Sequence, residues 1–524
     1  MKNASFLLIL LLSVFLLLPC AAQGEAVEAP ETQRLVFYEI FPCSFSDSDG
    51  DGVGDLRGIL NRLDYLNDGN PASKTSLGIQ GIWMTPVFAS PSYHKYDVTD
   101  YKTMDPAFGT LEDLQALIDG CHERGIRLIL DLPLNHTSRD HLWFKRFRQA
   151  RLMHNDQSAY YDYYLCYSPE ECPAGHACYP LQGTDFWYEG NFSQDMPELN
   201  YDNEAVRQEA LDIAKFYLDM GVDGFRFDAA KYISFGDNAR SADFWVWFTG
   251  ELRALSPDIW LVAEVWDGDG ITDQYVPAMN CFNFTLSQAS GLIADTASGG
   301  NANRYTAYVE KYTETVQALR PEAFLVPFIS NHDMDRAAGY LPDRDGKARM
   351  AANLYLLRPG APFIYYGEEI GLKGSRGSAN TDSNRRLAMR WGDGDPVADP
   401  PGSTYSSQTE NTVQQQLETE GSLLKHYQRV LRVRKENPEI ASGACAALAF
   451  DKTKLGGFLF TQEGRRVAVL HNPTKGSLSV DLKTVTDFAP SEIAALLEAL
   501  PGEGGASLEG TVVTLGACTS VVLR

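Results

Sequence analysis

Short apolar runs alternate with amphipathic helical stretches along most of the chain after residue 35. This alternation is typical of parallel strands joined by crossover helices. In one helical stretch, Val206, Ala210 and Tyr217 recur at helical spacing and share a face. The predicted strands cover residues 36–41, 79–84, 127–132, 224–227, 260–263, 281–284, 324–329 and 363–366. Eight strand and helix pairs predict an α/β fold, a (β/α)8 barrel of the TIM type.

Two parts of the chain depart from this pattern. Residues 137–200 are rich in aromatic residues and cysteine and lie between the third strand and its helix. After about residue 439 the pattern changes to strands separated by turns, at residues 457–461, 467–471, 478–482, 512–515 and 520–523. We therefore expect a barrel made of residues 35–136 and 201–438, an inserted domain at 137–200, and a C-terminal antiparallel β-sandwich at 439–524.

The N-terminus has the features of a signal peptide. Lys2 precedes an apolar run at residues 6–18, and small residues follow it up to Gly24. The run is too short for a membrane span, and no later stretch approaches twenty apolar residues. We predict that residues 1–24 are removed and that the protein is secreted, with lipidation of Cys20 and a cell-surface anchor as the alternative.

Composition and charge narrow the range of partners. Hydrophobic residues make up 44% of the chain and charged residues 22%, which is ordinary for a globular protein. The formal net charge of −24, from 45 basic and 69 acidic residues, repels phosphate backbones. Nucleic acid is therefore excluded as an expected partner, whereas a neutral substrate, a cationic partner or bound metal ions remain.

Three cysteines crowd a short irregular stretch. Cys166, Cys172 and Cys178 are interleaved with prolines and a glycine. In an oxidising compartment, a disulfide would staple such a loop. Zinc is the competing interpretation, but the spacing lacks a CxxC pair, so we favour the disulfide.

Acids, histidines and an arginine stand at four predicted strand ends. The third strand ends in DLPLNH, the fourth in GFRFDAAK, the fifth in VAEVW and the seventh in FISNHD. The loops at the carboxyl ends of barrel strands build the active site in this fold. A single acid there is more often a helix cap or an ion-pair partner, but four such strand ends in one barrel mouth favour a catalytic site.

Two carboxyl groups have the surroundings that glycoside hydrolysis requires. Arg226 and Asp228 leave the same face of their strand, and the cation is expected to lower the pKa of Asp228 and keep it ionised. Glu264 lies among apolar residues, which is expected to raise its pKa and suit a proton donor. Retaining glycosidases place such a pair about 5–5.5 Å apart. Asp333 is a third acid that could bind sugar hydroxyls.

The segment DSDGDGVGD has the spacing of a calcium loop. Carboxylates alternate around Gly52, but Gly58 stands where an EF-hand has its glutamate. The alternative is a solvated acidic turn without a metal. The predicted ligands are the side chains of Asp47, Asp49, Asp51 and Asp55 and the carbonyl of Val53.

In order and spacing, the four strand-end segments resemble the conserved regions of the α-amylase family, glycoside hydrolase family 13. The resemblance implies that Asp228 is the nucleophile, Glu264 the general acid and base, and Asp333 the stabiliser of the transition state. It also implies a sugar-binding site lined by Tyr96, His94, Asp131, His136, Arg226, Lys231 and His332.

The same resemblance also implies calcium sites and indicates which subgroup of the family this sequence is similar to. The acidic loop resembles a structural calcium loop found after the first strand in many members. A second calcium would use Asn135 and the carbonyl of a histidine after the lysine, but here Tyr232 follows Lys231, so this second site stays open. MPELN at residues 196–200 resembles the group intermediate between oligo-1,6-glucosidases and neopullulanases, whereas the DAAK that begins at Asp228 resembles α-1,4-specific amylases.

From these features we expect a secreted, monomeric α-amylase that cleaves α-1,4 bonds of starch and maltooligosaccharides with retention, and that carries structural Ca²⁺. One alternative is an exo-acting α-glucosidase or transglycosylase. Another is a non-catalytic glucan-binding homologue, although loss of a catalytic acid would be expected in such a protein.

Overall fold

The computed structural model describes residues 35–405 and 411–524. The predicted signal peptide at residues 1–24, with Cys20, lies outside the described residues, as does the predicted anchor. Within the described ranges, no helix combines the length and the apolar character needed to cross a bilayer.

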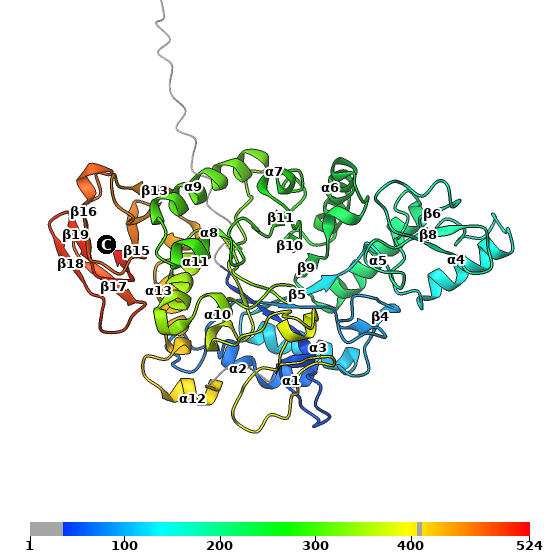
Figure 1. The fold of residues 1–524 in the computed structure, drawn as a ribbon, viewed down its shortest axis with the longest axis horizontal. Helices are drawn as coiled ribbons and strands as arrows, with labels where there is room; N and C mark the ends of the chain where they lie inside the picture. The colour runs from blue at the N-terminus through cyan, green and yellow to red at the C-terminus, as the bar shows by residue number, and fades with distance from the viewer. Residues whose placement is uncertain (1–34, 406–410) are drawn as a thin grey trace, which may run out of the picture.

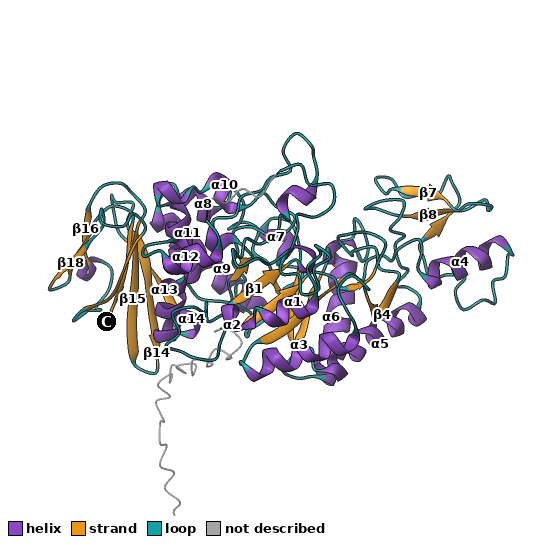
Figure 2. Ribbon diagram, turned by 90° about the horizontal axis from the view of Figure 1, so that it is seen from below, coloured by secondary structure: helices purple, strands orange, loops and turns teal. Residues whose placement is uncertain are grey.

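A parallel sheet curls around the centre of the molecule, as the pattern of apolar runs predicts (Figure 2). Its seven strands run in the order β12, β1, β2, β5, β9, β10, β11. The bounds are Phe37–Ile40 for β1, Gly81–Met84 for β2, Arg127–Leu132 for β5, Gly224–Phe227 for β9, Trp260–Ala263 for β10, Asn280–Cys281 for β11 and Phe363–Tyr365 for β12. Because the pairs are all parallel, the carboxyl ends of these strands meet at one end of the barrel.

The predicted seventh strand, at residues 324–329, is wrong as a regular strand. One isolated bridge at Val326 is its only ladder contact among the described residues. The segment nevertheless closes the barrel, because Asn283 N donates to Val326 O at 3.1 Å and Phe363 N donates to Pro327 O at 2.9 Å. Pro327 has no N–H group, so a continuous ladder cannot form on both sides of the segment.

Helices surround the sheet and are delimited by local signals (Figure 1). In α5, Asn203 caps the first turn by accepting from Ala205 N, and Gly221 ends the helix at φ 100°. These helices include α1 at Leu56–Asn61, α3 at Leu111–Glu123, α5 at Glu204–Met220, α6 at Asn238–Leu255, α9 at Ala302–Leu319, α11 at Lys347–Leu356 and α13 at Leu423–Glu436.

The inside of the barrel is a packed aromatic core. Phe37 points inward, where its ring lies 4.2 Å from that of Trp260, whereas Tyr38 belongs to the layer between sheet and helices. Trp83 and Phe363 belong to the same inner cluster. The barrel therefore has no axial pore at this level, and the site must lie above the strand ends.

Between β5 and α5 the chain forms a small separate sheet at one end of the molecule (Figure 1). It consists of β6 at Cys166–Tyr167, β8 at Trp187–Glu189 and β7 at Cys178–Pro180, preceded by α4 at Leu142–Leu152. A disulfide joins Cys172 to Cys178, with Cα atoms 6.4 Å apart, while Cys166 is free. The predicted disulfide staple is confirmed. The limits of the inserted domain stay a prediction.

At the opposite end of the molecule the chain finishes in two antiparallel sheets (Figure 1). The larger has the order β13, β14, β15, β20, β17 and the smaller β16, β19, β18. The pattern at residues 439–524 did not predict β13, β17 or β18. Their bounds are Ala444–Ala449 for β13, Gly456–Gln462 for β14, Arg465–Asn472 for β15, Leu478–Asp481 for β16, Ile493–Glu498 for β17, Ala506–Glu509 for β18, Val512–Leu515 for β19 and Thr519–Leu523 for β20.

Candidate active site

One buried guanidinium joins the acids of three neighbouring strands. Asp228 directly follows β9 and Glu264 directly follows β10, so both leave the same end of the barrel. Arg226 Nη1 lies 2.7 Å from Asp228 Oδ1, and Arg226 Nη2 lies 2.7 Å from Glu264 Oε2. Asp131, on β5, contacts the same Nη1 at 2.8 Å. The predicted convergence of these side chains is therefore present in the structure.

A second group of charges holds Asp333. His332 Nε2 lies 3.0 Å from Asp333 Oδ2, and Arg386 Nη2 lies 2.7 Å from Asp333 Oδ1. On its other side, His332 Nδ1 lies 2.7 Å from Glu39 Oε1 at the base of the site. Asp333 is thus fixed between two cationic partners.

Tyr96 connects the two groups. Its hydroxyl donates to Asp131 Oδ2 at 2.9 Å and lies 2.7 Å from His332 Nε2. Its ring stacks parallel to that of His332, with centroids 5.6 Å apart. This contact orients the phenol ring toward the space above the acids.

Burial sets the protonation of the two central acids. Burial raises the pKa of Asp228 to about 6, although Arg226 opposes this shift. The expected lowering of the Asp228 pKa is therefore wrong in direction, because removal from water outweighs the contact with Arg226. Burial also raises the pKa of Glu264, as expected, and the negative charges of Asp228 and Asp333 add to that rise. The raised pKa of Glu264 favours its protonated form, as a proton donor requires.

The pKa of Asp333, the third acid, is shifted in the opposite direction. Burial would raise the pKa of Asp333, but His332 and Arg386 together hold it well below its ordinary value. Burial would lower the pKa of His332, yet Asp333 and Glu39 raise it to about 10, so this imidazole is cationic at neutral pH. By contrast, burial lowers the pKa of His136 to about 4, and this ring is neutral.

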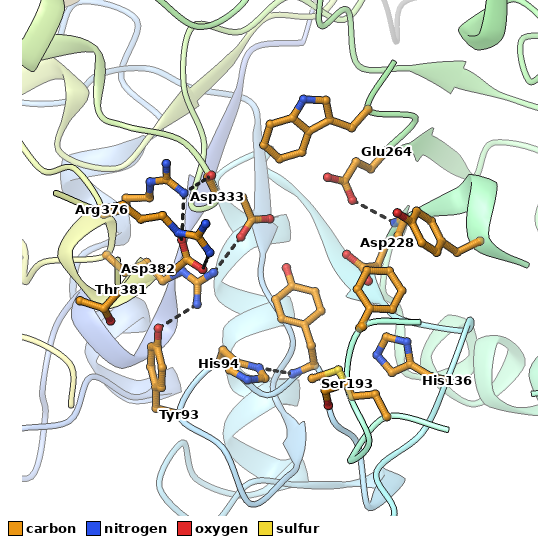
Figure 3. Close-up of a pocket in the computed structure, with 18 of the residues that line it drawn as sticks. Tyr93, His94, His136, Ser193, Asp228, Glu264, Asp333, Arg376, Thr381 and Asp382 are labelled. Atoms are coloured by element: carbon orange, nitrogen blue, oxygen red, sulfur yellow. Dashed lines mark hydrogen bonds and ion pairs between the residues drawn. The ribbon is translucent and has the colours of Figure 1, made fainter. Parts of the chain in front are cut away.

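A cavity of about 830 Å³ opens above these residues. Asp228, Glu264 and Asp333 point into the same space, as Figure 3 shows. The predicted residues that line it are Asp228, Glu264, Asp333, His94, Tyr96, His136 and Lys231. Asp131, Arg226 and His332 are fully buried and are not among the residues that line the cavity, so their part in the sugar-binding site stays a prediction.

A second cavity, of about 660 Å³, adjoins the first. Trp266, Asp333 and Arg385 line both of them. The Trp266 ring is 40% exposed and stacks on Phe284, with centroids 5.2 Å apart. Open space therefore extends away from the acids in more than one direction.

Sequence reasoning missed several residues of the site. Arg386 lies in a polar loop far along the chain, and only the fold brings it to Asp333. Phe192 lines the cavity from the inserted segment, with its ring 5.0 Å from that of His136. Neither has a local signal. Glu39 lies within the first strand as a buried acidic residue among apolar ones, which was a usable signal.

The acidic loop between β1 and α1 can accommodate a hard cation. One carboxylate oxygen each from Asp47, Asp49 and Asp55 lies within 4.8 Å of the others. Two oxygens on one Ca²⁺ are at most about 5 Å apart, so this grouping fits. Asp51 is outside the group, and its Oδ1 accepts from Val53 N at 2.7 Å instead. A role for the Val53 carbonyl stays a prediction.

Asn135 lies between the acids and the inserted segment. Its Nδ2 donates to Asp228 O at 2.8 Å, and its buried Oδ1 has no hydrogen-bond partner among the described residues. The amide oxygen is free for a ligand, but the second metal site stays a prediction.

Comparison with known proteins agrees with this geometry. The family model for the alpha amylase catalytic domain matches residues 39–443. Alpha-amylase 3 of Dictyoglomus thermophilum is 34% identical over 487 residues, covering 90% of this chain and 91% of that protein. A 4-alpha-glucanotransferase of Thermotoga neapolitana is 30% identical, covering 85% of this chain and 97% of that one. The solved structure of Eubacterium rectale Amy13B superposes with a TM-score of 0.85 at 33% identity, covering 95% of this chain and 96% of that one.

The barrel, the acids clustered at its strand ends and the match to the alpha amylase catalytic domain together define a glycoside hydrolase. The chain belongs to the α-amylase family, as its four strand-end motifs predict.

Proposed function

We propose that this enzyme is an exported, retaining α-glucan hydrolase that cleaves α-1,4 bonds of starch and maltooligosaccharides. The observation that carries the proposal is the shared contact of Arg226 with Asp228 and Glu264 on the wall of a cavity that Asp333 also lines. One ionised and one protonated carboxyl group beside a single cavity is the requirement of double displacement.

The proposed reaction uses each acid once in each half. Glu264 protonates the glycosidic oxygen while Asp228 attacks the anomeric carbon, which breaks the C–O bond and leaves a glycosyl-enzyme ester. Water then attacks the same carbon as Glu264 takes its proton, and Asp228 leaves as a carboxylate. Asp333, held ionised by His332 and Arg386, stabilises the positive charge that develops on the sugar ring.

The bond specificity rests on the DAAK segment and on the relative named alpha-amylase. Lys231 lines the cavity and donates to the backbone carbonyl of Trp266 at 2.9 Å, which holds its ammonium group at the cavity wall. This is a suitable position for a contact to a sugar beyond the cleaved bond.

The two adjoining cavities favour cleavage within a chain. An exo enzyme needs a pocket closed at one end, whereas here a second cavity adjoins the first at Trp266, Asp333 and Arg385. Transglycosylation is the second candidate, because a relative is named a glucanotransferase and a ring such as Trp266 can hold an acceptor sugar.

Replacing the nucleophile tests the assignment. We expect Asp228→Asn to lower turnover of maltoheptaose by more than about 10³-fold, because the amide cannot form the ester. The matched control is Asp223→Asn at the opposite end of the same strand, where the carboxylate accepts from Leu128 N. Undiminished turnover by Asp228→Asn, with the fold intact by circular dichroism, would reject the mechanism.

The products formed from maltoheptaose distinguish between the remaining modes of action. Early release of mixed maltooligosaccharides from maltoheptaose supports internal cleavage, glucose alone supports an exo glucosidase, and products longer than seven units support transfer. Starch binding without any product would indicate the non-catalytic alternative.

We also propose that the loop of Asp47, Asp49 and Asp55 holds a structural Ca²⁺.

A further inference from the structure

Two buried arginines meet where the barrel packs against the C-terminal sheets. Arg358 precedes β12, at the end of the barrel opposite the catalytic acids, and its side chain is 0% exposed. Arg434 lies on α13 and is 3% exposed. Arg434 Nη1 donates to Arg358 O at 2.6 Å, so the two residues are in direct contact.

The two guanidinium groups differ in how their N–H groups are used. Arg434 also donates to Leu356 O at 2.7 Å and to Gly360 O at 2.6 Å, which leaves only its Nε unpaired. Arg358 makes no well-aligned hydrogen bond through Nε, Nη1 or Nη2 in the described part of the chain, although the Tyr305 hydroxyl lies close enough to interact with it. The three nitrogens of this fully enclosed cation therefore lack a well-aligned acceptor among the described residues.

Two other fully buried arginines, Arg226 and Arg336, have partners that compensate for the burial of their charge. Arg226 contacts three carboxylates. Arg336 donates to two carbonyls and lies over the Tyr365 ring at 4.1 Å. For Arg358 and Arg434, the described residues supply neither an ion-pair partner within 4.0 Å nor a ring at cation–π distance.

The neighbouring titratable groups do not provide a negative charge. Tyr305 donates its hydroxyl to Leu354 O at 2.7 Å, and burial raises its pKa to about 12. Burial also raises the pKa of the Cys445 thiol well above its ordinary value. Burial, followed by repulsion from Arg358, lowers the pKa of Arg434 to about 9, which still leaves it protonated at neutral pH.

Two adjacent buried cations without a counter-charge destabilise the folded state. We propose that Arg358, together with Arg434 Nε, binds one small inorganic anion of the halide class at this junction. The ligand is small and monovalent because both side chains are enclosed and no third cation contributes. Its effect would be to stabilise the docking of the C-terminal sheets on the barrel, independently of the proposed catalytic reaction.

The experiment compares the melting temperature of the full chain in sodium chloride, sodium bromide and sodium gluconate at equal ionic strength. Gluconate is too large for an enclosed site. We expect the two halides to raise the melting temperature by a few degrees, with a saturable dependence on concentration, because an anion that binds only the folded state shifts unfolding. Equal melting temperatures in the three salts would overturn the proposal.

Variants separate a specific site from a general salt effect. Arg358→Met should abolish the difference between halide and gluconate. Arg349→Met is the matched control, because this buried arginine on α11 is paired with Asp343 at 2.7 Å and should leave the difference intact. A difference that persists in Arg358→Met would refute the site.

A direct measurement covers the case in which Arg358→Met does not fold. In crystals of the wild-type protein grown with sodium bromide, we expect an anomalous peak in contact with the Arg358 guanidinium. A map without that peak would refute the proposal. Neither result depends on whether the enzyme cleaves glucans.

Discussion

Arg226 shows how a single side chain sets the chemistry of its neighbours. It is fully buried and contacts Asp131, Asp228 and Glu264. If all three acids were ionised, the group would carry a net charge of about −2 in a medium that penalises charge. Burial therefore favours a proton on one of these acids, and it raises the pKa of Glu264.

Removing this cation should shift the pH dependence of catalysis. Arg226 opposes the effect of burial on Asp228, whose pKa is about 6. In Arg226→Met the Asp228 pKa rises further, so more of the nucleophile is protonated near neutrality. We expect kcat/KM to fall more at pH 6 than at pH 8, measured as a full pH profile. An equal loss at all pH values would contradict this electrostatic account.

Between secondary-structure elements, tyrosines hold a buried glutamate. Glu368 lies shortly after β12 and begins the short 3₁₀ helix at Glu368–Ile370. Its Oε1 accepts from Tyr355 of α11 at 2.7 Å and from Tyr427 of α13 at 2.9 Å. Burial raises the pKa of Glu368 to about 7. One carboxyl group thus links a strand end to two helices.

This raised pKa predicts a stability change with pH. The folded state holds the proton up to about pH 7, whereas the unfolded chain releases it near pH 4.5. The contribution is therefore fully present at low pH and is lost as pH rises through this window, by up to about 3 kcal/mol.

Glu368→Gln should flatten that dependence between pH 5 and pH 8 in urea unfolding, since glutamine stays neutral. The exposed Glu436→Gln on α13 serves as control and should leave the slope unchanged. Identical pH profiles for wild type and Glu368→Gln would contradict the assignment.

The loop before α1 supports a prediction about metal. Asp47 already accepts from Gly50 N and Gly52 N, each at 2.7 Å, so the loop is preformed and a cation adds to its stability. We expect a chelator to lower the melting temperature of the wild type but to have little effect on Asp49→Asn. Asp68→Asn, outside the loop, should respond like the wild type. A metal-free protein with unchanged stability would exclude the calcium.

Across the whole molecule, polar contacts fasten the C-terminal sheets to the barrel. Asn353 of α11 donates to Leu497 O at 3.3 Å and to Ser520 Oγ at 3.2 Å, and its Oδ1 lies 2.9 Å from His426 Nε2. All of these atoms are buried, so the partners have no water to replace Asn353.

Asn353→Leu should destabilise the protein as a unit. Leaving buried partners unpaired costs about 1–3 kcal/mol. We expect one cooperative urea transition in wild type and variant alike, with a lower midpoint in Asn353→Leu and unchanged specific activity when folded. Two separate transitions would show that barrel and C-terminal sheets unfold independently.

Much of the barrel could be predicted because buried parallel strands are continuous apolar runs. The predicted bounds of β5, β9 and β10 agree with the structure residue for residue. The segment around Val326 reads as a strand but lacks a regular ladder because of Pro327. In the C-terminal region, β13 has small residues and a largely exposed pattern, so its sequence gives no strong strand signal.

Local sequence was sufficient for the acids at the strand ends, because strand direction and alternation place Asp228 and Glu264 at one end of the barrel whatever the rest of the chain does. It was not sufficient for their protonation. The pKa of Asp228 depends on how completely distant segments exclude water, and the contact of Arg386 with Asp333 depends on a loop brought over the barrel by packing. Desolvation and long-range contacts are properties of the folded chain, and no short segment encodes them.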